Sequence, residues 1–204
     1  MKLHAFAPSP NSRKVLFLNT HLGLGIPVTD VDLPSGAQKS DAFLALNPMG
    51  KVPVLERDGD TPLWESNAIL NHLATRHPGP LTPGPADWAE VMRWQFWESC
   101  HLTPACGLMI AHHLFGAPGI DLDAAGSSVR HLAGILDRHL AGRDWLVGDG
   151  MSLADVSVAP VLYLRAPCRY PLDGLDHLAR WLERVEGMNG WPVADTLGAA
   201  ARVA

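Results

Sequence analysis

Residues 78–85 constrain the fold of this chain most strongly, because they read Pro-Gly-Pro-Leu-Thr-Pro-Gly-Pro. Proline lacks the backbone N–H that helices and inner strands use, and glycine weakens the interior of both. The stretch predicts a linker at 78–87, with one domain at 1–77 and a second at 88–204. A chain of 204 residues is long enough for two small domains.

The first 77 residues alternate between short apolar runs and helix-like runs, separated by turn-forming residues. Ser9, Asn11 or Ser12 is expected to cap the first helix, and Gly23 and Gly25 to end it. The expected order is strand, helix, strand, helix, strand, strand, helix, which describes a small α/β sandwich. The remaining expected elements are strands at 3–6, 28–33, 52–55 and 61–64 and helices at 40–46 and 65–77.

The pattern after the linker is helical throughout. Helices are expected at 88–115, with a kink at Pro104, and then at 123–140, 152–165 and 175–186. Ser152 and Asp155 have the spacing of a capping box, and Met151 and Val156 that of a hydrophobic staple. The second half is therefore expected to be all-α.

Charge and cysteine content exclude several functions. The formal net charge is −5 and the pI is near 6.0, which argues against nucleic acid or an anionic membrane as the main partner. The three cysteines form no Cys-x-x-Cys pair, so we expect reduced thiols in the cytoplasm, with Cys100 and Cys106 packed inside a helix. Neither a signal peptide nor a membrane-length apolar run is expected.

Residues 47–55 read Asn-Pro-Met-Gly-Lys-Val-Pro-Val-Leu and place a proline inside a β-forming run. Because proline donates no hydrogen bond to a ladder, it is confined to sheet edges, bulges and turns. Pro53 is a candidate for a cis peptide bond. A cis bond would bend the chain and leave the N–H and C=O of Val52 free at an edge, where an extended peptide pairs by strand addition. A turn proline without a partner is the alternative.

Three motifs resemble those of the glutathione transferase superfamily, in the family's order. Residues 47–55 resemble its segment with a cis-proline, residues 64–69 (Trp-Glu-Ser-Asn-Ala-Ile) resemble the start of a conserved helix, and residues 146–155 resemble its capping-box motif. The resemblance covers nearly the whole chain. It implies a thioredoxin-like α/β N-terminal domain, βαβαββα, followed by an all-helical domain.

The resemblance also implies a glutathione site. Glu65 and Ser66 correspond to the pair that holds the γ-glutamyl group, and a helix N-terminus favours an anion; simple N-capping is the alternative. Val52, before Pro53, would pair its backbone with the cysteinyl residue. The groups that would hold the glycine carboxylate are Gln38, Lys39 and Lys51; for the two lysines a solvated surface is the alternative.

The chemistry is expected at residues 9–13, which read Ser-Pro-Asn-Ser-Arg. Ser9 lies where the serine-type classes have their catalytic serine, which stabilises the glutathione thiolate by donating a hydrogen bond. Neither tyrosine nor cysteine precedes this helix, which excludes a tyrosine-type class and argues against thiol chemistry on the protein. Asn11 is a second candidate, because Ser-Pro-Asn resembles the Thr-Pro-Asn of disulfide-reducing members. Arg13 and Lys14 are expected in a solvated first turn.

The expected function is conjugation of glutathione, the co-substrate, to small apolar electrophiles, as in detoxification. The resemblance further implies a cytoplasmic homodimer, with residues 65–77 at the interface. Trp94, Trp97 and Met109 are expected in the core; the alternative is that some of them line the electrophile pocket together with Phe115. No metal is expected, because the adjacent His112 and His113 point about 100° apart on a helix. The alternatives are a glutathione-dependent disulfide oxidoreductase and a non-catalytic binding or scaffolding module.

Overall fold

The structure is a computed structural model that describes residues 1–191. The chain forms two compact units. One contains Met1–His77 together with the described residues that follow Gly187, and the other contains Pro78–Gly187.

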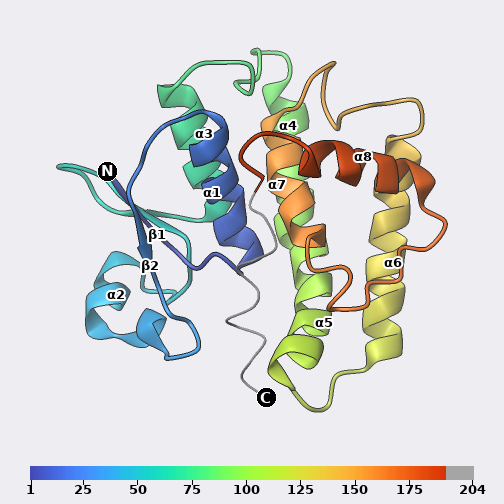
Figure 1. The fold of residues 1–204 in the computed structure, drawn as a ribbon, viewed down its shortest axis with the longest axis horizontal. Helices are drawn as coiled ribbons and strands as arrows, with labels where there is room; N and C mark the ends of the chain where they lie inside the picture. Colours follow the sequence, from blue (N-terminus) through green and yellow to red (C-terminus); the bar gives the residue numbers. More distant parts are fainter. Residues whose placement is uncertain (192–204) are drawn as a thin grey trace. The chain divides into compact units, whose positions relative to one another are not determined.

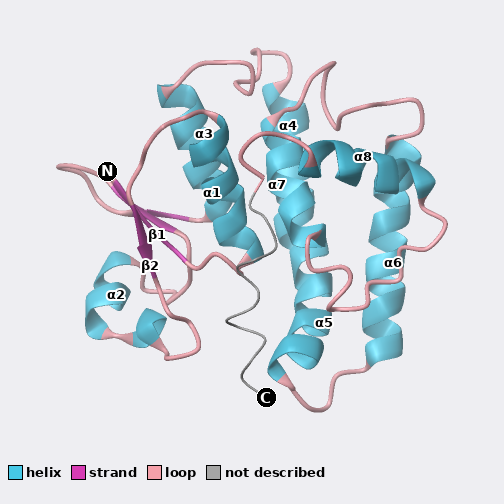
Figure 2. Ribbon diagram, in the orientation of Figure 1, coloured by secondary structure: helices cyan, strands magenta, loops and turns pink. Residues whose placement is uncertain are grey.

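The first unit is built on a four-stranded sheet with the order β2-β1-β3-β4 (Figure 2). Its strands are β1 (Lys2–Ala5), β2 (Val28–Asp30), β3 (Val54–Glu56) and β4 (Leu63–Trp64). β1 pairs in parallel with β2, and the other two pairings are antiparallel. All four expected strands are present; β1 is shifted by one residue, and the other three are shorter than expected. The second ends at Asp30 because the backbone N–H and side chain of Ser35 bond to Asp32 and turn the chain.

Three α-helices and a short 3-10 helix complete this unit. They are α1 (Pro10–His21), η1 (Ala37–Lys39), α2 (Asp41–Leu46) and α3 (Ser66–Arg76), and α1 lies beside α3 (Figure 1). Ser9 caps α1 and Ser40 caps α2, each accepting a backbone N–H. The observed order βαβαββα is the expected one.

The residues after Gly187 return to α1. The Trp191 ring packs edge-on against Phe17 at 5.4 Å between centroids, and a His21 ring nitrogen lies 2.8 Å from the carbonyl oxygen of Asn189. Gly190 has φ +90°, and a Cβ there would lie 2.7 Å from the backbone nitrogen of His21. This close approach therefore requires glycine.

The second unit is helical, as expected. Its helices are α4 (Trp88–Trp97), the π-helical segment η2 (Glu98–Leu102), α5 (Thr103–Phe115), α6 (Leu122–His139), α7 (Leu153–Leu162) and α8 (Asp176–Glu186). No helix of the described chain is both long and apolar enough to cross a membrane.

The long helix expected at 88–115 is interrupted by η2, just before Pro104. Glu98 begins this segment and is fully buried. Its carboxylate accepts hydrogen bonds from the hydroxyls of Ser99, Thr103 and Ser157. These three hydroxyls satisfy the hydrogen-bonding needs of the buried carboxylate at the π-helical turn. Single π-helical turns inside α-helices are frequent at functional sites.

α7 is the core helix of the second unit, and all its residues are buried. The expected capping box is present, with Ser152 accepting from the first turn and Asp155 reaching back to the Ser152 N–H. The helix ends at Leu162, three residues earlier than expected, in a run of turns that begins with the Arg165 N–H bonded to the Leu162 carbonyl.

Candidate functional site

The N-terminus of α1 presents a hydroxyl and backbone donors. The Oγ atom of Ser9 accepts a hydrogen bond from the N–H of Ser12 over 3.4 Å. A hydroxyl has one donor hydrogen besides its acceptor lone pairs, so this contact leaves the O–H of Ser9 available to a ligand. No acidic residue lies in the first turn of α1, so its positive dipole end is not neutralised there. Capping the helix and donating to a thiolate are therefore compatible for Ser9.

The N-terminus of α3 is also open to an anion. Glu65 precedes the helix with φ 71°, which is uncommon for a residue with a Cβ. Its side chain is exposed and makes no capping hydrogen bond, and the first turn of α3 has no acidic residue. The first N–H groups of an α-helix have no acceptor within the helix, so the start of α3 favours an anion. Uncommon backbone conformations of this kind cluster at ligand sites.

A chain of polar contacts joins these two helix N-termini. Nζ of Lys14 donates to Oγ of Ser66 over 3.3 Å, and that hydroxyl donates to Oδ1 of Asn11 over 3.3 Å. Asn11 and Lys14 lie three residues apart on α1, so their side chains share one face of the helix. The contact uses the oxygen of the Asn11 amide and leaves its NH₂ group as a donor.

The expectation of a solvated first turn at Arg13 and Lys14 is wrong, because both side chains are fully buried. Nη1 of Arg13 donates to the carbonyl oxygen of Ala7 over 3.2 Å. α1 is buried around most of its circumference, so even its charged residues are enclosed. Residue spacing could have predicted the burial of Lys14. It lies four residues before the buried Leu18 and therefore shares the same face of the helix.

Gln38 and Lys39 of η1 meet the loop before β3 at Gly50. Gly50 has φ +60°, and a Cβ there would lie 3.0 Å from the carbonyl oxygen of Gln38 and 3.2 Å from Nζ of Lys39. The Lys39 ammonium thus lies against the residue that precedes Lys51, and both lysines are exposed. The side-chain oxygen of Gln38 is buried and has no hydrogen-bond partner among the described residues. Two cations and an unused buried acceptor are suited to a peptide-like anion.

The peptide bond between Val52 and Pro53 is cis, as expected. β3 begins only at Val54, which pairs with His4 on one side and Trp64 on the other. Val52 lies just before this inner strand, so it is not on an edge strand. Within residues 1–191, its N–H and C=O make no backbone hydrogen bond. An extended ligand can therefore still pair with Val52.

Sequence comparisons identify the family to which this chain belongs. One family model, the N-terminal domain of glutathione S-transferases, matches residues 8–76, and another, the C-terminal domain, matches residues 105–189. The chain is 34% identical to glutathione S-transferase 3 of maize (Zea mays) over 200 residues, which cover 91% of this chain and 88% of the relative. This chain belongs to the glutathione S-transferase family.

Relatives of this glutathione S-transferase family member are named for different activities. It is 29% identical to the disulfide-bond oxidoreductase YfcG of Escherichia coli, over 88% of this chain and 87% of the relative. A solved glutathione transferase from Pseudomonas putida, with one glutathione disulfide bound per subunit, superposes with a TM-score of 0.83 at 25% identity. That match covers 99% of this chain and 90% of the other. The thioredoxin-like first domain and helical second domain expected from the sequence are confirmed.

The site residues expected from the glutathione S-transferase motifs fall into two groups in the first unit. Asn11 and Ser66 are in direct contact, and Gln38 and Lys39 adjoin the residue before Lys51. Within the described chain, no hydrogen bond or ion pair joins the side chain of Ser9 to either group. The motifs gave no role to Lys14.

The remaining candidate residues lie in the helical unit of this glutathione S-transferase family member. Trp94 and Met109 are buried, as expected for core residues, whereas Phe115 is 72% exposed. Cys106 is buried but Cys100 is exposed, so the expectation that Cys100 packs inside the helix is wrong. The described residues contain no group of three or more His, Cys, Asp or Glu side chains that is suited to a metal ion.

Proposed function

We propose that this protein binds glutathione at the N-terminal ends of α1 and α3 and transfers its thiolate to small apolar electrophiles. The observation that carries the proposal is the Lys14–Ser66–Asn11 chain of contacts. It holds two helix N-termini together, and neither has an acidic residue in its first turn. Such a pair of open N-termini favours a ligand that carries negative charge at more than one point.

Each part of glutathione has a matching group in this proposal. The γ-glutamyl carboxylate meets the N–H groups of α3 and the Ser66 hydroxyl, and Glu65 receives the amine. The cysteinyl backbone pairs with Val52, next to Pro53. The glycine carboxylate meets the side chains of Gln38, Lys39 and Lys51.

Ser9 supplies the chemistry by donating its hydroxyl hydrogen to the glutathione sulfur. A free thiol has a pKa near 8.5, and a helix N-terminus with a donor lowers this value. A lowering of about two units corresponds to roughly 2.7 kcal/mol of preference for the thiolate. The thiolate then forms a bond from sulfur to carbon, and the leaving group departs with its electron pair.

The experiment is a calorimetric titration of glutathione into wild type, Ser9→Ala and Ser9→Thr, with the thiolate absorbance of each complex followed against pH. We expect all three to bind glutathione. The thiol pKa should be lowered in wild type and Ser9→Thr and close to the free value in Ser9→Ala. An unlowered pKa in wild type contradicts the role of Ser9. No binding contradicts the enzyme proposal and favours a scaffold with unused motifs.

A second candidate function, glutathione-dependent reduction of disulfides, is favoured by the position of Asn11. Its amide is fixed by Ser66 at the same helix N-terminus, and its NH₂ group remains a donor for sulfur. In this reaction two glutathione thiols become one glutathione disulfide, and the substrate disulfide becomes two thiols. Turnover of hydroxyethyl disulfide that Asn11→Ala abolishes, with little activity on aryl halides, would favour it over conjugation.

We also propose that the protein acts as a homodimer in the cytoplasm. The family resemblance supports self-association, with Glu65–His77 as part of the interface. The reduced state expected for the three cysteines supports a reducing compartment. Light scattering of the purified protein at several concentrations tests the dimer, and a monomer at all of them would contradict it.

A further inference from the structure

The hydroxyl group of Ser66 has two neighbours of different kinds. Its oxygen accepts a hydrogen bond from Nζ of Lys14, and its hydrogen is donated to Oδ1 of Asn11, over 3.3 Å in each case. A hydroxyl carries a single hydrogen, and an ammonium group donates hydrogen bonds but accepts none. The hydrogen of Ser66 therefore cannot turn to Lys14, and Asn11 is its acceptor in this structure.

Burial decreases along these three residues. Lys14 is fully enclosed, Ser66 is 8% exposed, and Asn11 is half-buried. Ser66 is the first residue of α3 and Asn11 the second of α1, so their contact lies between the two helix N-termini. Lys14 closes the inner side of the Ser66 hydroxyl. A ligand at the helix N-termini therefore reaches this hydroxyl from the side of Asn11.

A bound carboxylate and the Asn11 amide compete for this single hydrogen. A hydrogen bond to an ionised carboxylate is roughly twice as strong as one to a neutral amide oxygen. When Ser66 donates to a carboxylate, its donation to Asn11 ends. The side chain of Asn11 makes no other hydrogen bond to the described residues. Its amide is then free to turn.

We propose that the Ser66 hydroxyl is a two-position donor, whose hydrogen goes to Asn11 in the free protein and to the γ-glutamyl carboxylate in the glutathione complex. The inference rests on the proposed function, because it uses the carboxylate position given there. Asn11 is thus a positioning residue that competes with the ligand for Ser66. Binding of the carboxylate releases the Asn11 amide at the N-terminus of α1, beside the place proposed for the sulfur.

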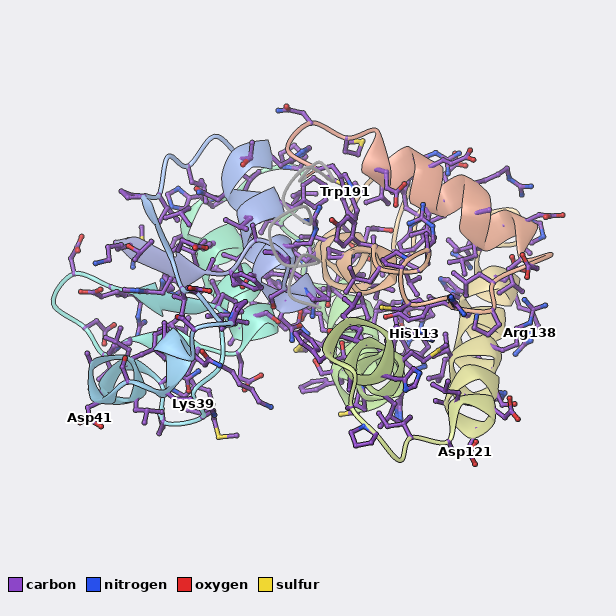
Figure 3. The ribbon with its side chains drawn as sticks, turned by 60° about the horizontal axis from the view of Figure 1, so that its bottom comes forward. Lys39, Asp41, His113, Asp121, Arg138 and Trp191 are labelled. Atoms are coloured by element: carbon purple, nitrogen blue, oxygen red, sulfur yellow. The ribbon has the colours of Figure 1, made fainter. Side chains whose placement is uncertain are left out.

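The probe is S-methylglutathione, which keeps the γ-glutamyl carboxylate but has no thiol, so a contact between Asn11 and a thiolate does not contribute to its binding. In the proposed function its glycine carboxylate is held elsewhere, by groups that include Lys39 on the η1–α2 segment (Figure 3). The ligand therefore stays anchored when Ser66 is changed. Calorimetry measures its dissociation constant for wild type, Asn11→Ala, Ser66→Ala and the double variant.

Loss of the competing acceptor should strengthen binding. We expect Asn11→Ala to bind S-methylglutathione about threefold more tightly or better, the change that loss of an ordinary neutral hydrogen bond produces. Ser66→Ala should bind more weakly, and Asn11→Ala should add nothing once Ser66 is replaced. Asn11→Leu, which also lacks an acceptor, should behave like Asn11→Ala. Asn189→Ala is the matched control, because Asn189 is exposed and contacts His21 through its backbone carbonyl.

The decisive comparison is the effect of Asn11→Ala with and without the Ser66 hydroxyl. An equal effect in both backgrounds, or a weakening that needs the hydroxyl, would overturn the two-position donor. The proposed function would then stand, because the ligand still binds to wild type. Absence of binding to wild type would overturn both. Ser66→Thr keeps a hydroxyl and should restore the effect of Asn11→Ala, and circular dichroism establishes that each variant is folded.

Discussion

The Nζ atom of Lys14 lies 3.3 Å from the Oγ atom of Ser66, in a buried contact between α1 and α3. The two residues are 52 positions apart in the sequence. The contact puts a cation directly behind the hydroxyl that we propose for the γ-glutamyl carboxylate. It therefore gives Lys14 a role that its place in a charged helical turn does not suggest.

We predict that Lys14→Met weakens glutathione binding about tenfold, because Ser66 loses a charged donor and the site loses a nearby positive charge. Ser66→Ala should have an effect of similar size. If the two residues act as one unit, the double variant should be little worse than either single variant, because effects in a shared network are not additive. Calorimetry measures the four dissociation constants, for wild type, the two single variants and the double variant. Full additivity would show that Lys14 acts independently of Ser66.

We predict that Asp155→Ala lowers the free energy of unfolding by about 3 to 5 kcal/mol, because it leaves several buried donors without an acceptor. The Asp155 carboxylate accepts hydrogen bonds from the N–H groups of Leu146 and Ser152, the Ser152 hydroxyl and the Trp181 indole, over 2.8 to 3.0 Å. Asp149→Ala, in the exposed part of the same loop, is the control and should cost under about 0.5 kcal/mol. Urea denaturation measures both, and equal losses would contradict the prediction.

The three cysteines should differ sharply in reactivity. Burial raises the pKa of the Cys106 thiol to about 12 and that of Cys168 to about 11, whereas Cys100 is exposed. At pH 8 only about one in 10⁴ of the Cys106 thiols and one in 10³ of the Cys168 thiols is ionised, and the thiolate is the reactive form. Ellman's reagent should therefore modify one thiol quickly in the folded protein. Cys100→Ser should remove this fast phase, and a fast phase that survives would refute the assignment.

Glu56 should make stability depend on acid pH. Its carboxylate lies 2.9 Å from a His4 ring nitrogen, and this hydrogen bond, followed by the charge of Lys2, lowers its pKa below the ordinary 4.5. The folded state thus binds the proton less tightly than the unfolded chain does. The stabilisation is present above pH 4.5 and is lost as the pH falls through the folded pKa. The stability difference between wild type and Glu56→Gln should therefore shrink in acid. A constant difference at all pH values would show that the carboxylate's charge does not matter.

The order of elements could be predicted from sequence because local features determine it. Ser9, Ser40 and Ser152 each accept a backbone N–H at a helix start, as the residue types at those positions predict. The proline- and glycine-rich residues 78–85 break regular structure wherever they occur. The cis peptide before Pro53 is likewise present. In each case the physical cause acts within a few residues.

Other features required the tertiary structure, because they depend on residues far apart in the chain. Lys14 is buried only because α1 packs against α3, and no local pattern specifies which polar residue that packing encloses. One of the donors to the buried Glu98 carboxylate is the hydroxyl of Ser157, 59 positions later in the sequence. The guanidinium of Arg130 on α6 is held by the carbonyl oxygens of Pro171 and Asp173, which lie more than 40 positions later in the sequence. The sequence by itself determined the elements and their order, and packing decided which charges are enclosed and what they can bind.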